Sequence, residues 1–142
     1  MANALYPKYK QKLLDPGTLG TTSGDAVDLA GDNIKVVLVD LADYTYSSSH
    51  EFLSDITGVG RVATSANLGS KTVTNGLFDA ADTSFSAVTG DISEAIVIYK
   101  DTGTASTSSL IAYFDTGITG IPVTPNGGDI NVTFNASGIF QL

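Results

Sequence analysis

Two Asp-Thr-Gly triplets are the first residues in this sequence that could carry out chemistry. They begin at Asp101 and Asp115, and aspartic proteases use a pair of such loops to bring together two carboxylates that share one proton. If residues 95–101 and 108–115 form an antiparallel hairpin, these aspartates lie at its opposite ends, roughly 20–25 Å apart at about 3.3 Å per residue. We therefore expect turn residues here, and no catalytic pair within one chain.

Metal-binding chemistry has little support in the residue types. His50 is the only histidine and cysteine is absent, so a zinc site would need carboxylates alone. The position of His50 in the first turn of a predicted short helix favours a solvated polar residue. Asp25, Asp28 and Asp32 could offer oxygen ligands to calcium, but their spacing matches no calcium loop and an acidic loop explains them equally. We expect no catalytic residue, metal or cofactor.

Aromatic residues offer a different kind of chemistry, the stacking of sugar rings. Four tyrosines fall in predicted strands and turns: Tyr44, Tyr46, Tyr99 and Tyr113. Tyrosines in such positions more often pack in a core or an interface, so a glycan-binding module remains an alternative function. The glycine-containing stretches do not follow the strand–loop–helix order of a phosphate-binding loop, which argues against nucleotide binding.

Composition favours one all-β domain. The 142 residues are 42% hydrophobic and only 15% charged, with 15 glycines, and the abundant β-branched residues suit a pleated sheet. The net charge of −8 argues against nucleic acid or an anionic membrane as partner. Because neither a secretory signal nor an apolar run of about 20 residues is visible, we expect synthesis in the cytoplasm and no membrane span.

The charge pattern divides the chain into three parts. Residues 1–15 contain three lysines ahead of the first acidic residue, whereas residues 13–142 carry 4 basic and 15 acidic residues. We expect residues 1–15 to form a helical arm, with a helix over Ala4–Leu14 and Pro7 in its first turn. Residues 16–33, rich in Gly, Thr, Ser and Asp, are predicted to be a flexible loop or linker. Residues 34–142 are predicted to form the β-domain.

Within the β-domain, Ile34–Asp40 is predicted to be a strand buried on both faces because its run of apolar residues is nearly continuous. The Ser48-x-x-Glu51 spacing resembles a capping box and predicts a short helix carrying Phe52, Leu53 and Ile56. The remaining strands are expected at 60–65, 71–78, 83–89, 95–101, 108–115, 129–135 and 139–142. Closely spaced strands of this kind indicate a mainly antiparallel β-sandwich or partly open barrel.

The N-terminal helix is the candidate binding site. Residues at spacings of three and four form an apolar face with lysines beside it; the expected partner-binding residues are Leu5, Tyr6, Lys8, Tyr9, Lys12 and Leu13. Two interpretations stay open, namely that this face covers the end of its own domain, or that it docks on a neighbouring subunit or an acidic partner. The second interpretation makes the helix a tether, with the lysines adding orientation and association rate.

Several segments resemble small structural proteins encoded among the virion genes of tailed bacteriophages. The matching segments span nearly the whole chain and are 3–10, 34–40, 42–47, 50–53, 61–63, 95–101 and 125–130, of which the opening Asn-Ala-Leu-Tyr-Pro-Lys-Tyr-Lys is the most specific. The resemblance implies a virion part with no catalytic residues. It favours a capsid decoration or cement protein that binds the major capsid protein or other virion proteins as a homodimer or homotrimer. A tail, neck or fibre-base component is the alternative within the same class.

Overall fold

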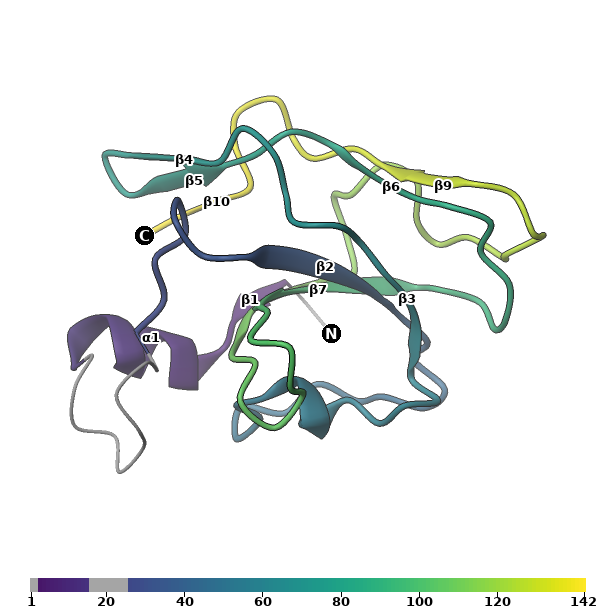
Figure 1. The fold of residues 1–142 in the computed structure, drawn as a ribbon, viewed down its shortest axis with the longest axis horizontal. Helices are drawn as coiled ribbons and strands as arrows, with labels where there is room; N and C mark the ends of the chain where they lie inside the picture. Colours follow the sequence, from purple (N-terminus) through teal and green to yellow (C-terminus); the bar gives the residue numbers. More distant parts are fainter. Residues whose placement is uncertain (1–2, 16–25) are drawn as a thin grey trace.

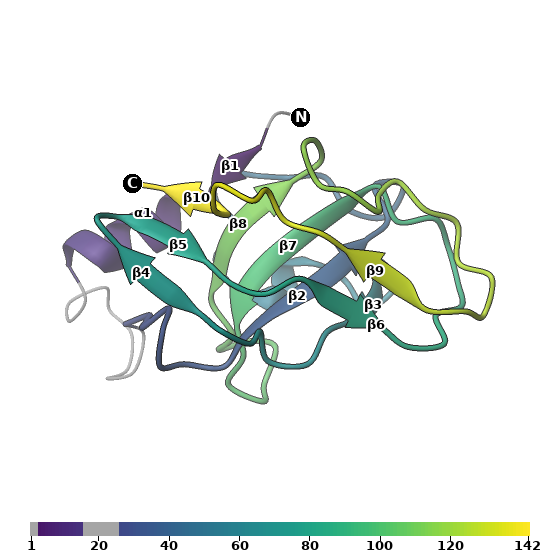
Figure 2. The same ribbon diagram turned by 90° about the horizontal axis from the view of Figure 1, so that it is seen from above.

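The computed structural model describes residues 3–15 and 26–142, and the strands among them pair into antiparallel β-sheets. The central sheet has the order β1-β8-β7-β2-β3, formed by Ala4–Leu5, Leu110–Phe114, Ala95–Lys100, Ile34–Val39 and Arg61–Thr64. Two smaller sheets lie over one face of it (Figures 1 and 2). One is β10-β5-β4 and the other is β6-β9, formed by Phe140–Gln141, Leu77–Asp79, Thr72–Thr74, Thr83–Phe85 and Ile130–Val132. The prediction of an all-β fold is confirmed.

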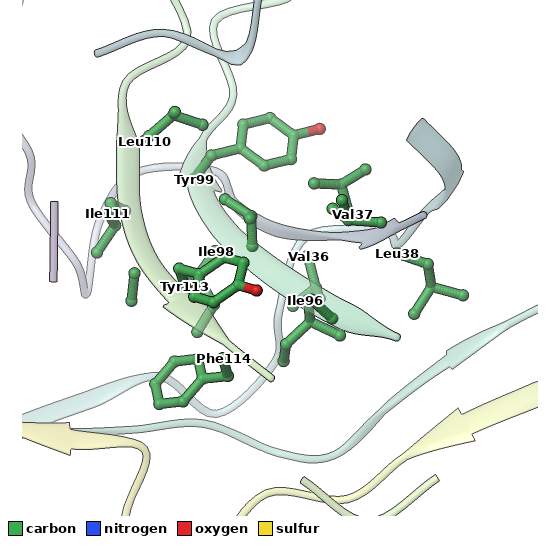
Figure 3. Close-up of a cluster of buried hydrophobic side chains, with 14 of the residues drawn as sticks. Val36, Val37, Leu38, Ile96, Ile98, Tyr99, Leu110, Ile111, Tyr113 and Phe114 are labelled. Atoms are coloured by element: carbon green, nitrogen blue, oxygen red, sulfur yellow. The ribbon is translucent and has the colours of Figure 1, made fainter. Parts of the chain in front are cut away.

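Strands β2, β7 and β8 form the centre of the hydrophobic core. All residues of β8 are buried, and β2 and β7 each have one half-buried lysine among buried residues. Figure 3 shows their side chains gathered around these strands, including Val36, Ile98 and Phe114. One face of the sheet is covered by the small sheets and the other by the segment 41–57, as Figure 1 shows. This double cover confirms the prediction that residues 34–40 contain a strand buried on both faces.

The predicted helix over Ala4–Leu14 is correct only in its second part. Residues Ala4–Leu5 form strand β1, and helix α1 begins at Pro7 and ends at Leu14. Tyr6 between them is extended, with φ −63° and ψ 131°. The physical reason is that a proline disfavours helical geometry in the residue before it, while its own fixed φ suits the first helical position.

The predicted short helix is present as a single 3-10 turn, η1, over Leu53–Asp55. Its predicted capping box is wrong. The cap is the carboxylate of Asp55, whose Oδ2 accepts hydrogen bonds from the backbone N–H groups of Glu51 and Phe52, at 2.7 and 2.9 Å. This carboxylate thus satisfies two backbone donors at the start of the turn.

The predicted strand at 71–78 is a hairpin. Strands β4 and β5 pair through Thr74 and Leu77, and the two residues between them have φ values of 52° (Asn75) and 79° (Gly76). Two consecutive left-handed residues define the type I′ turn, for which Asn-Gly is the preferred sequence. The other predicted strands are present in shorter form, with bounds given above.

Part of the predicted linker is an ordered turn on the β-domain. Residues 16–25 lie outside the described residues, but Leu29 is only 8% exposed. The Asp28 Oδ1 atom accepts hydrogen bonds from the N–H groups of Ala30 and Gly31, and Asp32 Oδ2 accepts one from Asp28 N. Lys100 Nζ lies 3.0 Å from Asp32 Oδ2. Two of the three aspartates considered as calcium ligands therefore hold this turn, and Asp25 lies outside the described residues.

Candidate functional site

The N-terminal segment completes one edge of the central sheet. Ala4 and Leu5 pair with Tyr113 and Ala112, and Tyr6 N donates a hydrogen bond to Ile111 O at 3.0 Å. Before the strand, Asn3 Oδ1 accepts hydrogen bonds from the backbone N–H groups of Asp115 and Thr116. These bonds fix the segment in register along β8.

Two tyrosines anchor this segment in the core. Tyr6 and Tyr9 have no exposed side-chain surface. The Tyr6 hydroxyl lies 2.7 Å from the Tyr44 hydroxyl, and burial, with a smaller effect of Tyr44, raises the pKa of Tyr6 far above its ordinary value. Burial alone raises the pKa of Tyr9 to about 12, and the Tyr9 ring packs edge-on against Phe140. Both hydroxyls therefore stay protonated at any physiological pH.

Lys12 is the third buried residue of the segment. It is 2% exposed, and its Nζ lies 3.1 Å from Glu51 Oε1 and 2.8 Å from Ser109 Oγ. The ammonium group also lies 4.5 Å from the centroid of the Phe52 ring. Its charge is compensated inside the chain, so it is not presented to an acidic partner.

These contacts correct part of the predicted binding face. Tyr6, Tyr9 and Lys12 were expected to contact a partner, but side chains of the same chain cover them. Leu5 and Lys8 are half-buried, and Leu13 is 38% exposed. The helix therefore covers its own domain, which is the first of the two interpretations above, and only its last turn presents large apolar side chains outward.

Helix α1, the β4–β5 hairpin and the C-terminus meet at one end of the molecule (Figures 1 and 2), and several of the exposed apolar side chains lie there. A groove of about 260 Å³ there is lined by Tyr9, Leu13, Val27, Asp28, Leu29, Ala30, Val73 and Leu142. Leu13, Val73 and Leu142, which we call the end patch, are 38%, 50% and 61% exposed. Strand β4 is also the outer strand of its sheet. Sequence reasoning missed Val73 and Leu142, because nothing local places them beside α1.

A second surface feature is a pocket of about 210 Å³ lined by Leu41, Tyr44, Thr45, Tyr46 and Tyr113, which we call the tyrosine pocket. The Tyr46 ring centroid lies 5.1 Å from that of Tyr6 and 5.4 Å from that of Tyr113. Tyr44 and Tyr113 are buried, and Tyr46 is half-buried. Three of the four tyrosines considered for sugar stacking thus come together, while Tyr99 does not line this pocket.

His50 belongs to the same network of aromatic side chains. Its Nδ1 lies 3.0 Å from the Tyr44 hydroxyl, and the two ring centroids are 5.4 Å apart. The expectation of a simply solvated histidine is therefore wrong, since the side chain is partly buried and its Nδ1 atom contacts the Tyr44 hydroxyl. The spacing of the two residues could not reveal this contact, because the intervening chain is irregular.

The two Asp-Thr-Gly triplets lie at opposite ends of the β7–β8 hairpin, as predicted from their spacing. Asp101 Oδ1 accepts a hydrogen bond from Gly103 N at 3.0 Å, and Gly117 of the second triplet has a φ of 72°. Both triplets therefore form turns, and the β7–β8 hairpin separates the two carboxylates.

The ion pair between Asp101 and Lys35 predicts a pH dependence of stability. Lys35 Nζ lies 2.6 Å from Asp101 Oδ2, and this hydrogen bond lowers the pKa of Asp101, against the opposing effect of burial. A lowered native pKa stabilises the fold above the unfolded-state value, about 3.9, and this stabilisation disappears as the pH falls through the native value. The stability advantage of the wild type over Asp101→Asn should therefore shrink between pH 5 and pH 2, as measured by urea unfolding. An advantage that stays constant over this range would contradict the pairing.

Three carboxylates also meet near the start of the segment 41–57. Carboxylate oxygens of Asp40, Asp43 and Asp91 lie within 4.8 Å of one another. Asp40 Oδ1 accepts a hydrogen bond from Ala42 N at 2.8 Å, so at least this carboxylate has a role in the local turn. The sequence did not single out this group because Asp91 is distant along the chain.

Comparison with known proteins adds no family to these observations. No protein-family model matches the chain, and no curated protein matches it either. Among the described residues, no helix is both long and apolar enough to cross a membrane. Any functional proposal therefore depends on the sequence features and on the two surfaces described above.

Proposed function

We propose that this chain is a structural protein of a tailed-bacteriophage virion, and that it decorates and stabilises the outer surface of the capsid. The structural observation that carries the proposal is the end patch, a set of exposed apolar side chains that line one groove of an acidic domain. Contiguous exposed apolar surface is typical of a protein-binding site. The resemblance of the opening segment and of the β2 segment to virion proteins supports the choice of a capsid protein as partner.

The buried N-terminal segment changes how such a protein would bind. A tether would require α1 to leave the domain, whereas here Tyr6, Tyr9 and Lys12 are part of the core. The domain would instead dock as one rigid body and bury Leu13, Val73 and Leu142 against the major capsid protein. A standard interface buries roughly 1,600 Å², and repetition of a modest contact over a shell stabilises the particle collectively. Self-association into dimers or trimers would add to this effect.

Copy number tests this function most simply. Virions of the phage that encodes the chain would be purified and their proteins quantified by mass spectrometry with isotope-labelled peptides. A decoration protein should be present in hundreds of copies per particle, in a fixed ratio to the major capsid protein. A handful of copies would assign the chain to the tail or neck instead, and its absence from purified particles would reject a virion role.

A further inference from the structure

We infer that the tyrosine pocket binds the guanidinium group of an arginine side chain presented by the protein on which this chain docks. The identity of that partner as a virion protein rests on the proposed function. The chemistry of the pocket does not, because it follows from the rings and carboxylates that surround it.

The rings provide a flat surface for a planar cation. The Tyr46 ring makes tilted contacts with two buried rings, with centroid distances of 5.1 Å to Tyr6 and 5.4 Å to Tyr113, and its own side chain is half-buried. Leu41 and Thr45 complete the lining. Arginine stacks its planar guanidinium on such a face and loses less hydration in doing so than the compact ammonium of lysine.

Carboxylates make the pocket attractive to a cation. Glu94 Oε2 accepts a hydrogen bond from the N–H of Leu41, a lining residue, at 2.8 Å. The Tyr113 hydroxyl donates to Asp115 Oδ2 at 3.3 Å. After burial, which is the largest cause, the charges of Asp115 and Glu94 both raise the pKa of Tyr113. Two carboxylates therefore act on lining residues of the pocket, on a chain whose net charge is −8, and negative charge of this kind draws cationic groups toward it.

A partner other than a second copy fits this pocket better. The sequence contains one arginine, Arg61, and its Nε donates to the backbone oxygen of Thr57 at 3.4 Å. A sugar fits less well, because the Tyr44 hydroxyl already contacts both Tyr6 and His50.

The test is a titration of the full-length chain with Nα-acetyl-arginine amide, followed by ¹H–¹⁵N NMR. The neutral isostere Nα-acetyl-citrulline amide and methyl glucoside serve as comparison ligands. We expect arginine amide to shift the amide signals of residues 41–46 and 113, and to do so less at high salt, because salt screens charge. Citrulline and glucoside should leave these signals in place. No shift with arginine amide, or an equal or larger shift with citrulline or glucoside, would overturn the inference.

Two variants locate the binding. Glu94→Gln keeps an oxygen that can accept the Leu41 N–H hydrogen bond but removes the charge. It should weaken the binding of arginine amide about three- to fivefold. Tyr46→Leu removes the aromatic face on which the guanidinium stacks, and should weaken the binding of arginine amide by a similar factor. Asp79→Asn removes an equal charge from β5, in the opposite layer, and should change nothing. Unchanged affinity in both pocket variants, with spectra that show a folded chain, would place any binding elsewhere. Because these measurements need no virion, their failure is distinguishable from that of the proposed function.

Discussion

Replacing Tyr6 with alanine is expected to lower the free energy of unfolding by about 3–5 kcal/mol. Tyr6 is fully buried between the central sheet and the segment 41–57, where its ring contacts Tyr46 and its hydroxyl contacts Tyr44. Truncation leaves a cavity that rigid neighbours cannot fill, and it also removes a hydrogen-bond partner. Urea unfolding followed by circular dichroism measures the change, and a constant m-value would show that the two states compared are the same.

Two further variants show whether this loss reflects burial. Tyr6→Phe keeps the ring and should cost only about 1 kcal/mol, because the Tyr44 hydroxyl retains its contact with His50. Leu14→Ala changes a side chain that is 89% exposed, and should stay within about 0.5 kcal/mol of the wild type. If Tyr6→Ala cost no more than Leu14→Ala, the N-terminal segment would not be part of the folded core.

Replacing Lys12 with alanine is expected to have the next largest effect, about 2–4 kcal/mol. The substitution leaves the Glu51 carboxylate without the cation that lies 3.1 Å away and removes the ammonium group above the Phe52 ring. Because Glu51 is 21% exposed, water compensates part of this loss. Lys12→Met fills more of the space and should cost less than Lys12→Ala, by the same unfolding measurement.

A double variant separates the ion pair from simple packing. Lys12→Met with Glu51→Gln removes both charges and should recover much of the stability lost in Lys12→Met alone, because no uncompensated charge remains. Lys10→Ala, on the exposed side of the same helix, should change the stability by less than about 0.5 kcal/mol. A double variant less stable than Lys12→Met would show that Glu51 has another role.

Much of the β-domain could be predicted because its strands have a clear local sequence pattern. The apolar run at 34–40 predicts a strand covered on both faces and the run at 95–101 predicts a strand, and the structure places β2 and β7 there. The opposite positions of Asp101 and Asp115 followed from hairpin geometry. The Asn75-Gly76 turn was also visible in the sequence, and a stricter use of turn chemistry would have divided the predicted strand at 71–78.

The surface on which the N-terminal segment packs could not be predicted from its sequence pattern. An apolar stripe on a helix shows that something covers it but not which chain provides the cover. Pro7 disfavours a helical conformation of Tyr6, which the predicted helix over Ala4–Leu14 did not take into account, and two residues are too few to identify β1 without its partner, β8. The burial of Lys12 was hidden for the same reason, since its partners Glu51 and Ser109 come from distant parts of the chain.

The two surfaces depend even more on tertiary structure. The end patch joins α1, β4 and the last residue, and the tyrosine pocket joins the segment 41–46 to Tyr113 on β8. Leu13 and three of the tyrosines were candidates from the sequence, but no local signal showed which residues would lie beside them. Such sites become visible only when the order of the strands is known.

Occupancy of particles by end-patch variants tests the central claim most directly. Purified protein would be added to virions that lack it, and bound copies counted by mass spectrometry after sedimentation. The variant Val73→Glu/Leu142→Glu should lose most binding, since it places two charges in the apolar interface, whereas Val59→Glu, at a residue that is 69% exposed elsewhere, should saturate like the wild type. Saturation by the folded end-patch variant at the wild-type level would contradict docking through this surface.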